Sequence, residues 1–296
     1  MAKDPKKDRA VVVPPSGGQM VHRQSRFPHL PVNPWRILCS GRSGSGKTSA
    51  MWSAITDHYK GVFTRLIIVC RTAKLDHSYV QLREWAEKHL GQDDTEKKFV
   101  FTWMDEDAFY SIFKEQEQIV AKEKVQRKID KSKAPLSSTV WVIDDLSDSM
   151  SLRQRNESVL NKLFTTGRHS SQSVFLNIHS MVSAGPLLRK NASALILFKI
   201  SNSKDYKTVS EEFGHLVGGT DVFDEVYQAA LGPKSPPYSF LVIKPHEQDI
   251  NETFLARWDQ KITVESDDEE DEEFEEPVAE RPRRKAPVDT KVEVFK

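Results

Sequence analysis

Eight residues from Gly41 to Thr48 read GRSGSGKT, and their types and spacing could hold a phosphate group. Glycines let a chain turn tightly enough for successive backbone N–H groups to point into one anion-sized hollow. An apolar run at residues 35–40 precedes the loop, and a second apolar run, through Met51 and Ile55, follows it. A strand, a glycine-rich loop and a helix in this order are typical of a phosphate-binding P-loop.

The P-loop interpretation gives two side chains specific ligands. Lys47 would reach the β- and γ-phosphates of ATP, and the Thr48 hydroxyl would bind the Mg²⁺ that bridges these phosphates. The alternative is a glycine-rich surface turn with no ligand. The residues expected to contact the nucleotide are Gly41, Ser43, Gly44, Ser45, Gly46, Lys47 and Thr48.

Two adjacent acids, Asp144 and Asp145, follow an apolar run at residues 140–143. A buried strand delivers its C-terminal residues to the edge of the sheet where a P-loop also lies. We expect Asp144 to join the Mg²⁺ shell, directly or through water, and Asp145 to orient or deprotonate the attacking water. The alternative is a pair of acids that ends a strand in a solvent-facing turn.

Short apolar strands alternate with helices from residue 35 onward, which predicts a three-layer α/β domain with a mainly parallel sheet. After the strand that precedes the P-loop, strands are expected at residues 66–70, 99–103, 139–145, 173–179, 194–200 and 238–243, the last at a sheet edge. Helices are expected at residues 105–133, 151–166, 204–213 and 221–231.

Composition divides the chain into three regions. Residues 1–34 hold six prolines and no periodicity, so we expect a mobile basic arm. Residues 35–264 are expected to form one P-loop domain, with a charged helical insertion at about 105–133 that projects into solvent or contacts nucleic acid or another subunit. Residues 265–296 hold 13 acidic and 6 basic residues, including a short basic patch at 281–285. A disordered tail is expected there, or an acidic DNA mimic that covers a basic surface.

Several classes of protein are disfavoured by the composition. No apolar stretch approaches the length of a membrane span, and the N-terminus does not resemble a signal peptide, so a soluble protein that is not secreted is expected. The only two cysteines, Cys39 and Cys70, end predicted strands and are interpreted as small core residues. Residues 1–264 hold 37 basic and 30 acidic residues, a mild excess that is compatible with a polyanionic partner.

These motifs together resemble the FtsK and HerA superfamily of ring-shaped ATPases that pump DNA. Within it, the sequence is most similar to the poxvirus-type genome-packaging ATPases of large DNA viruses, virophages and related elements. The resemblance covers about residues 35–245 and also rests on the segments at residues 163–180 and 187–209, which follow the P-loop and the paired acids. It implies the RecA-like, additional-strand form of the P-loop NTPase fold.

The resemblance also implies roles for individual residues. Asp145 falls where many relatives have a catalytic Glu, which is longer by one methylene group. The polar sensor of the family, often a Gln, falls on His179, with Asn177 as the substitute. An arginine from the neighbouring subunit completes such sites; Arg168 and Arg189 are the candidates, and Arg168 is favoured because it opens the turn into the sensor strand.

The implied function is an ATP-hydrolysing motor that translocates double-stranded DNA without sequence preference, most directly to package a viral genome into a preformed capsid. Its implied partners are DNA, identical subunits in a pentameric or hexameric ring and a capsid or portal protein, with no membrane. The expected location is the virion or the site of virus assembly, in a cytoplasmic factory or the nucleus. Candidate channel residues are Arg71, Lys74, Lys204 and Lys207.

Three other functions stay open at this point. The first is a P-loop nucleoside or nucleotide kinase, which would need no arginine from a partner. The second is a nucleotide-gated scaffold or DNA-binding assembly factor without turnover. The third is a plasmid or cellular DNA pump of the same superfamily.

Overall fold

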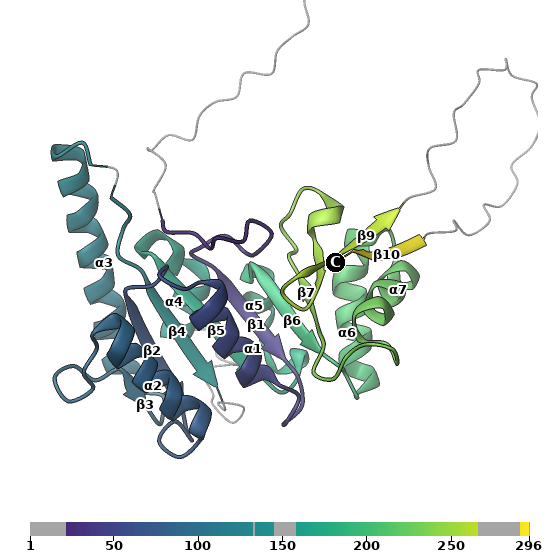
Figure 1. The fold of residues 1–296 in the computed structure, drawn as a ribbon, viewed down its shortest axis with the longest axis horizontal. Helices are drawn as coiled ribbons and strands as arrows, with labels where there is room; N and C mark the ends of the chain where they lie inside the picture. The colour runs from purple at the N-terminus through teal and green to yellow at the C-terminus, as the bar shows by residue number, and fades with distance from the viewer. Residues whose placement is uncertain (1–21, 133, 145–157, 266–290, 296) are drawn as a thin grey trace, which may run out of the picture.

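A computed structural model of the chain describes residues 22–132, 134–144, 158–265 and 291–295. The described strands form one ten-stranded sheet in the order β10-β9-β8-β7-β6-β1-β5-β4-β2-β3 (Figure 1). The strands are β1 (Arg36–Ser40), β2 (Arg65–Cys70), β3 (Val100–Phe101), β4 (Thr139–Asp144), β5 (Gln172–Ile178), β6 (Ala194–Phe198), β7 (Phe240–Ile243), β8 (Phe254–Ala256), β9 (Gln260–Glu265) and β10 (Lys291–Phe295).

Six neighbouring strands, from β3 to β6 in the sheet order, are parallel. They are almost entirely buried, which explains their continuous apolar sequences, because parallel strands are covered on both faces. Strand β5 pairs with β1 on one side and with β4 on the other. One strand therefore separates the P-loop strand from the strand that ends in Asp144. The predicted fold class, a three-layer, additional-strand P-loop NTPase with a mainly parallel sheet, is confirmed.

Helices cover both faces of the parallel strands. In Figure 1, α1 and α2 lie in front of these strands, and α4 and α5 lie behind them. Helix α3 packs beside α4, and α7 packs against α6 and against β7 to β9. The helices are α1 (Lys47–Ser53), which continues as a π-helical turn (Ala54–His58), α2 (His77–Leu90), α3 (Glu106–Ile129), α4 (Val159–Thr165), α5 (Pro186–Asn191), α6 (Ser203–Phe213) and α7 (Thr220–Leu231).

Aromatic side chains fill the core between the sheet and its helices. Trp35 is fully buried, and its ring centroid lies 5.3 Å from the ring centroid of Tyr59 and 6.1 Å from that of Phe175. Cys39 and Cys70 are buried in β1 and β2 as reduced cysteines, as expected for small core residues, and burial raises the pKa of Cys39. The strand residues therefore serve mainly to bury apolar surface.

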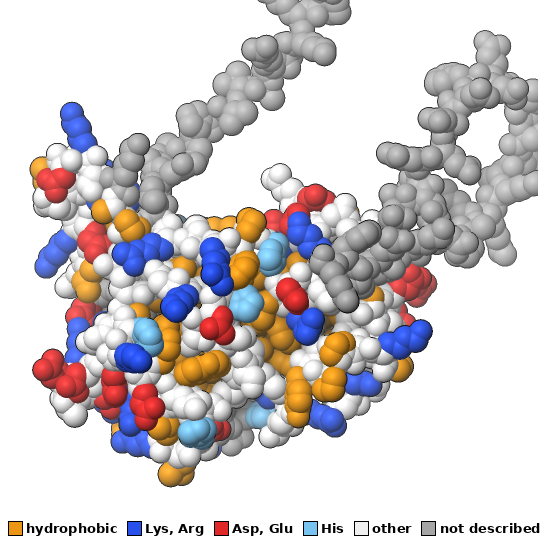
Figure 2. Space-filling view, in the orientation of Figure 1, with side chains coloured by type: hydrophobic (Ala, Val, Ile, Leu, Met, Phe, Trp, Pro, Cys, Tyr) orange, Lys and Arg blue, Asp and Glu red, His pale blue; other side chains and the backbone are white. Residues whose placement is uncertain are grey.

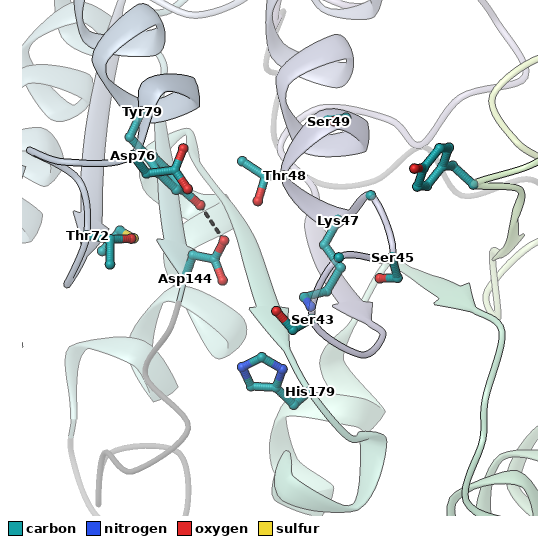
Figure 3. Close-up of a pocket in the computed structure, with 14 residues that line it drawn as sticks. Ser43, Ser45, Lys47, Thr48, Ser49, Thr72, Asp76, Tyr79, Asp144 and His179 are labelled. Atoms are coloured by element: carbon teal, nitrogen blue, oxygen red, sulfur yellow. Dashed lines mark hydrogen bonds between the residues drawn. The ribbon is translucent and has the colours of Figure 1, made fainter.

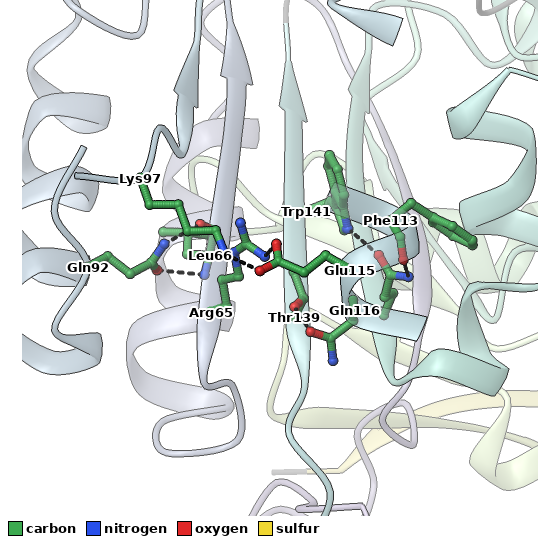
Figure 4. A network of polar contacts seen from close by, with 10 residues as sticks. Arg65, Leu66, Gln92, Lys97, Phe113, Glu115, Gln116, Thr139 and Trp141 are labelled. Carbon is green, nitrogen blue, oxygen red and sulfur yellow. Dashed lines mark hydrogen bonds and ion pairs between the residues drawn. The ribbon is translucent and has the colours of Figure 1, made fainter. Parts of the chain in front are cut away.

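The first half of α3 is fixed to the sheet by apolar and polar contacts. Its buried side chains include Phe109, Ile112, Phe113 and Val120, which lie on one face of the helix. Gln116, 2% exposed, accepts a hydrogen bond from the Thr139 hydroxyl at 2.9 Å and donates to the Ser137 carbonyl at 3.0 Å (Figure 4). The C-terminal end of α3 extends beyond the sheet in Figure 1.

Ion pairs add to this attachment at the preceding residue of α3, Glu115. Arg65 donates to Glu115 Oε2 at 2.9 Å, and Lys97 donates to Glu115 Oε1 (Figure 4). Burial alone would raise the pKa of Glu115, but the hydrogen bonds from Lys97 and Arg65 outweigh it and lower the pKa. The carboxylate therefore holds α3 against β2 in its ionised form.

The predicted mobile arm is wrong for residues 22–34. Leu30 and Asn33 are buried, and the Gln24 amide bonds to the backbone of Asn33 through Nε2, at 2.7 Å, and Oε1, at 2.8 Å. The Tyr59 hydroxyl donates to the Pro31 carbonyl at 2.6 Å. Side chains thus satisfy this backbone without helix or strand, so no periodicity reveals the order. Residues 1–21 lie outside the described part of the chain.

The C-terminal part of the sheet also differs from the prediction. Strand β7 is not an edge strand, because it pairs antiparallel with both β6 and β8, and the antiparallel extension continues through β9 to β10. The predicted disordered tail is therefore wrong for residues 291–295, whose alternating apolar residues form β10. Residues 266–290, including the basic patch, lie outside the described residues. Helices α2 and α5 were not predicted.

Replacing Gln116 with Leu tests the attachment of α3. The substitution leaves the buried Thr139 hydroxyl and the Ser137 carbonyl without their partner, so we expect the free energy of unfolding to fall by about 1–3 kcal/mol in urea titrations. Gln118→Leu, at an exposed position of the same helix, is the matched control and should change stability by less than about 0.5 kcal/mol. Equal effects of the two substitutions would contradict this account.

Candidate functional site

The P-loop connects the C-terminal end of β1 to the N-terminal end of α1. Its backbone is left-handed at Gly44 (φ 73°) and Gly46 (φ 101°), where a side chain would strain the chain. No side chain caps α1 at Gly46, and the buried Ser45 hydroxyl has no hydrogen-bond partner among the described residues. Free N–H groups beside an unpaired buried hydroxyl fit an oxygen-rich anion such as a phosphate.

Lys47 is buried within this loop, with 7% of its surface exposed. Its ammonium group donates to the carbonyl oxygens of Gly41, at 2.7 Å, and Arg42, at 3.1 Å. In Figure 3 the ammonium group lies beside Ser43, in the concave part of the loop. An ammonium group has three donors, so Lys47 can also donate to a phosphate bound by the loop.

A cavity of about 610 Å³ adjoins the loop. Residues from the ends of β2, β4 and β5 and from the start of α2 complete its wall (Figure 3). Its lining residues are Ser43, Gly44, Ser45, Gly46, Lys47, Thr48, Ser49, Cys70, Thr72, Asp76, Tyr79, Asp144, His179 and Tyr238.

Asp144 lies at the end of β4, 9% exposed, on the wall opposite the P-loop. Its Oδ2 atom accepts hydrogen bonds from the Tyr79 hydroxyl and, at 2.8 Å, from Asn177 Nδ2. Thr48 lines the same cavity as Asp144 and Tyr79, at the start of α1.

The groups at this point fit Mg²⁺. A hydroxyl and a carboxylate offer the hard oxygen ligands that Mg²⁺ prefers, and protein sites for this ion commonly use one or two carboxylates together with substrate phosphates. The described residues contain no group of three His, Cys, Asp or Glu that could hold a metal without such a substrate. Thr48 and Asp144 would therefore hold Mg²⁺ together with a phosphate. Asp145 lies outside the described residues.

Tyr79 is a site residue that the sequence analysis missed. It is 2% exposed on α2, which begins after Asp76, whose carboxylate accepts a hydrogen bond from the Ser78 N–H. Burial, followed by the negative charge of Asp144, raises the pKa of Tyr79 well above its usual value, so the hydroxyl stays protonated and donates to Asp144. The apolar spacing of Tyr79, Leu82 and Ala86 could have predicted the helix, but not this contact.

Asn177 and His179 occupy different places around Asp144. The Asn177 amide donates to the carboxylate, while its buried carbonyl oxygen has no hydrogen-bond partner in the described part of the chain. His179 lines the cavity, and in Figure 3 its ring lies below Asp144 and Ser43. His179 is thus placed to face a bound phosphate, whereas Asn177 orients Asp144.

Arg189 and Arg168 both lie away from the cavity. The Arg189 guanidinium is held internally, through Nε to Glu212 at 2.7 Å and through Nη1 to the Ala184 carbonyl at 2.5 Å, and its side chain is 14% exposed. These contacts fix α5 to α6 and leave the Arg189 guanidinium engaged within its own subunit. Arg168 precedes β5, whereas the P-loop lies near the end of β5, so the strand separates them.

Arg168 lines a basic cavity at the end of the parallel strands opposite to the P-loop. This cavity, about 580 Å³, is also lined by His22, Arg36, Lys244 and His246. Burial, and then the positive charge of Arg168, lower the pKa of Arg36, and Arg36 Nε is buried without a partner among the described residues. Two neighbouring guanidinium groups with spare donors can accept an anion from outside the subunit.

No protein-family model matches the chain, and neither does any curated protein sequence. Solved structures with a similar fold do exist. The genome packaging NTPase B204 from Sulfolobus turreted icosahedral virus 2, in complex with AMP, has a TM-score of 0.51 and 16% identity and covers 76% of this chain and 98% of its own.

The complex of the same NTPase with ATP-gammaS has a TM-score of 0.48 and 16% identity, with coverage of 76% of this chain and 98% of its own. EssC (ATPases 2 and 3) from Geobacillus thermodenitrificans has a TM-score of 0.48 and 12% identity, covering 83% of this chain and 47% of EssC. The likeness to the AMP complex of B204 shows that this chain has the P-loop NTPase fold of a viral packaging NTPase.

Gly41→Ala tests the geometry of the loop. A Cβ atom at Gly41 would lie 2.6 Å from Ser45 Oγ and 2.8 Å from Phe198 Cβ, and Phe198 is fixed in β6, so the loop must shift. We expect inorganic tripolyphosphate, measured by calorimetry with Mg²⁺, to bind at least about 10-fold more weakly, a difference of about 1.4 kcal/mol. Gly219→Ala, where an added Cβ meets no atom within 4 Å, should bind as the wild type does. Unchanged binding by Gly41→Ala would contradict the role of the loop.

Proposed function

We propose that the chain is an ATP-hydrolysing motor that translocates double-stranded DNA and packages a viral genome into a preformed capsid. The main support is the meeting of Lys47, Thr48 and Asp144 around one cavity. This arrangement offers a phosphate cradle and a carboxylate in the same cavity, as a metal-bound nucleotide requires. The fold shared with B204, a genome packaging NTPase, supports the choice of cargo.

Five residues have distinct tasks in the proposed ATP hydrolysis. Lys47 binds the β- and γ-phosphates, and Thr48 and Asp144 hold Mg²⁺, which neutralises charge that develops on the phosphate oxygens. Asp145 orients or deprotonates the attacking water. Tyr79 fixes the orientation of the Asp144 carboxylate from α2.

The sensor position is divided between two residues. Asn177 donates to Asp144 and so positions the metal-binding carboxylate from β5. His179 faces the cavity, where its ring N–H can donate to the γ-phosphate or to the attacking water. His179 is therefore the sensor in this proposal.

The arginine that completes the site comes from a neighbouring subunit. Arg168 lies at the opposite end of the parallel strands from its own P-loop. In this proposal it therefore acts on the nucleotide of another copy. A head-to-tail arrangement of identical subunits meets this requirement and closes into a ring, pentameric or hexameric. Arg189 is bound to Glu212 and serves the fold instead.

We assign DNA binding to the segments that follow β2 and β6. Arg71 and Lys74 lie in the loop after β2, whereas Lys204 and Lys207 lie in α6, which follows β6, at the same end of the parallel strands as the P-loop. The face drawn in Figure 2 shows basic and acidic side chains interspersed. In this proposal, the four basic side chains named above contact the phosphates of DNA. Phosphate contacts give binding without sequence preference that weakens as the salt concentration rises.

The proposed place of action is the site of virus assembly, where the motor docks on a capsid or portal protein. None of the helices in the described part of the chain combines the length and the hydropathy that a bilayer-spanning helix requires. A nucleoside or nucleotide kinase, a non-hydrolysing scaffold and a plasmid or cellular DNA pump are the alternatives, and the experiments below distinguish the first two.

Phosphate release from ATP tests the proposed activity. We expect long double-stranded DNA to stimulate it, whereas Lys47→Ala and Asp144→Asn should lower it at least about 100-fold because charge stabilisation is lost. Lys60→Ala, at an exposed lysine outside the cavity, is the control and should match the wild type. Stimulation by nucleosides instead of DNA would indicate a kinase, and a wild type without phosphate release would indicate a scaffold.

Mixing two inactive variants tests whether Arg168 acts on a neighbouring subunit. Arg168→Ala keeps an intact P-loop and Lys47→Ala keeps an intact arginine, so rings with both subunits contain some complete sites. Random mixing at equal amounts should restore about one quarter of the wild-type ATPase rate, since one interface in four combines the two intact parts. Mixtures that stay inactive would exclude Arg168, and Arg189→Ala should show reduced thermal stability instead.

A further inference from the structure

A second cavity adjoins the P-loop on the side away from Asp144. It has a volume of about 310 Å³ and shares Gly44, Ser45 and Tyr238 with the first cavity. Its remaining wall comes from the end of β6 and from the segment between α7 and β7, and includes Arg42, Lys199 and Ser235. The two cavities therefore meet at the loop and at Tyr238.

The backbone at Tyr238 adopts a conformation that an aromatic residue rarely has. Its φ angle is 61°, in the left-handed region, and for a bulky side chain this is an outlier. Pro236 and Pro237 precede it, and the Ser239 N–H donates to the Pro236 carbonyl at 3.2 Å, which closes the turn. Strain of this kind persists where the surrounding structure imposes it, and it is concentrated at ligand sites.

This turn presents the Tyr238 side chain beside the P-loop. The residue is 72% exposed, although a large apolar ring gains free energy when it is covered. A Cβ atom built on Gly46 would lie 3.4 Å from Tyr238 Cβ and Cδ1 and 3.4 Å from Phe198 Cε1. The Phe198 ring packs against Phe240 of β7, with centroids 5.3 Å apart, so a rigid aromatic base supports this region.

The residues of the first cavity indicate which end of a bound triphosphate lies toward β4 and β5. Thr48, Asp144 and His179 place the γ-phosphate and its metal toward β4 and β5. The α-phosphate must then lie at the other end of the loop, and the nucleoside leaves toward β6 and β7. Tyr238 and the second cavity lie on that side.

We propose that Tyr238 is the platform on which the base of the bound nucleoside triphosphate stacks, and that the second cavity holds the nucleoside. The inference deepens the proposed ATPase function and rests on it. A base offers a flat face to an exposed aromatic ring, and this contact covers apolar area on both partners. The turn fixes the Cα–Cβ direction of Tyr238 beside the loop before the ligand arrives, which reduces the entropy lost on binding.

Calorimetry with two ligands tests this inference in the presence of Mg²⁺. Tyr238→Ala should bind a non-hydrolysable ATP analogue, AMPPNP, about 10-fold more weakly, but should bind inorganic tripolyphosphate as the wild type does, since only AMPPNP has a base. Tyr238→Trp should retain the AMPPNP affinity because an indole ring also stacks. Tyr110→Ala, at an exposed tyrosine of α3 outside both cavities, is the matched control.

Tyr238→Gly separates stacking from folding. Glycine adopts a φ of 61° without strain, so this variant should unfold at or above the wild-type temperature and yet bind AMPPNP as weakly as Tyr238→Ala. AMPPNP affinities equal to the wild type in both variants would overturn the base platform and leave the proposed ATPase intact. Base-dependent binding that requires Tyr238, in a protein that releases no phosphate from ATP, would instead overturn the motor and support the platform.

Discussion

The parallel pairing of β5 between β1 and β4 determines where every group of the site lies. Cys39 of β1 is opposite Asn177 of β5, and the Gly41 N–H donates to the Ile178 carbonyl at 3.2 Å. The start of the P-loop is thereby fixed to the end of β5. A shift of one residue between these strands would turn Asn177 to the opposite face of the sheet. The Asp144 carboxylate would then lose the amide that orients it.

The parts of the site that the sequence predicts are those encoded within short segments. The two left-handed glycines of the P-loop, the buried lysine and the strand that ends in Asp144 all follow from local patterns of a few residues. The parallel strands could also be predicted, because strands covered on both faces are continuously apolar. Their order in the sheet could not be predicted, since strand order depends on contacts between distant segments.

The parts that could not be predicted depend on contacts across the chain. Tyr79 and Asp144 are 65 positions apart, and an apolar helix position gives no indication that a tyrosine hydroxyl reaches the Asp144 carboxylate. Tyr238 follows two prolines, which indicate a turn but not its location beside Gly46. Strands β8 to β10 are short, and their pairing in an antiparallel sheet depends on β7.

Residues 22–34 connect two regions that the sheet alone does not join directly. His29 Nε2 donates to the Trp258 carbonyl at 2.7 Å, and Lys244 Nζ donates to the His29 carbonyl at 2.9 Å, so this segment is bound to the antiparallel strands. The Phe27 ring lies 5.4 Å from the ring of His58, at the end of the helical span that begins at the P-loop. A displacement of the antiparallel strands would therefore be transmitted through residues 22–34 to the helical span that follows the P-loop.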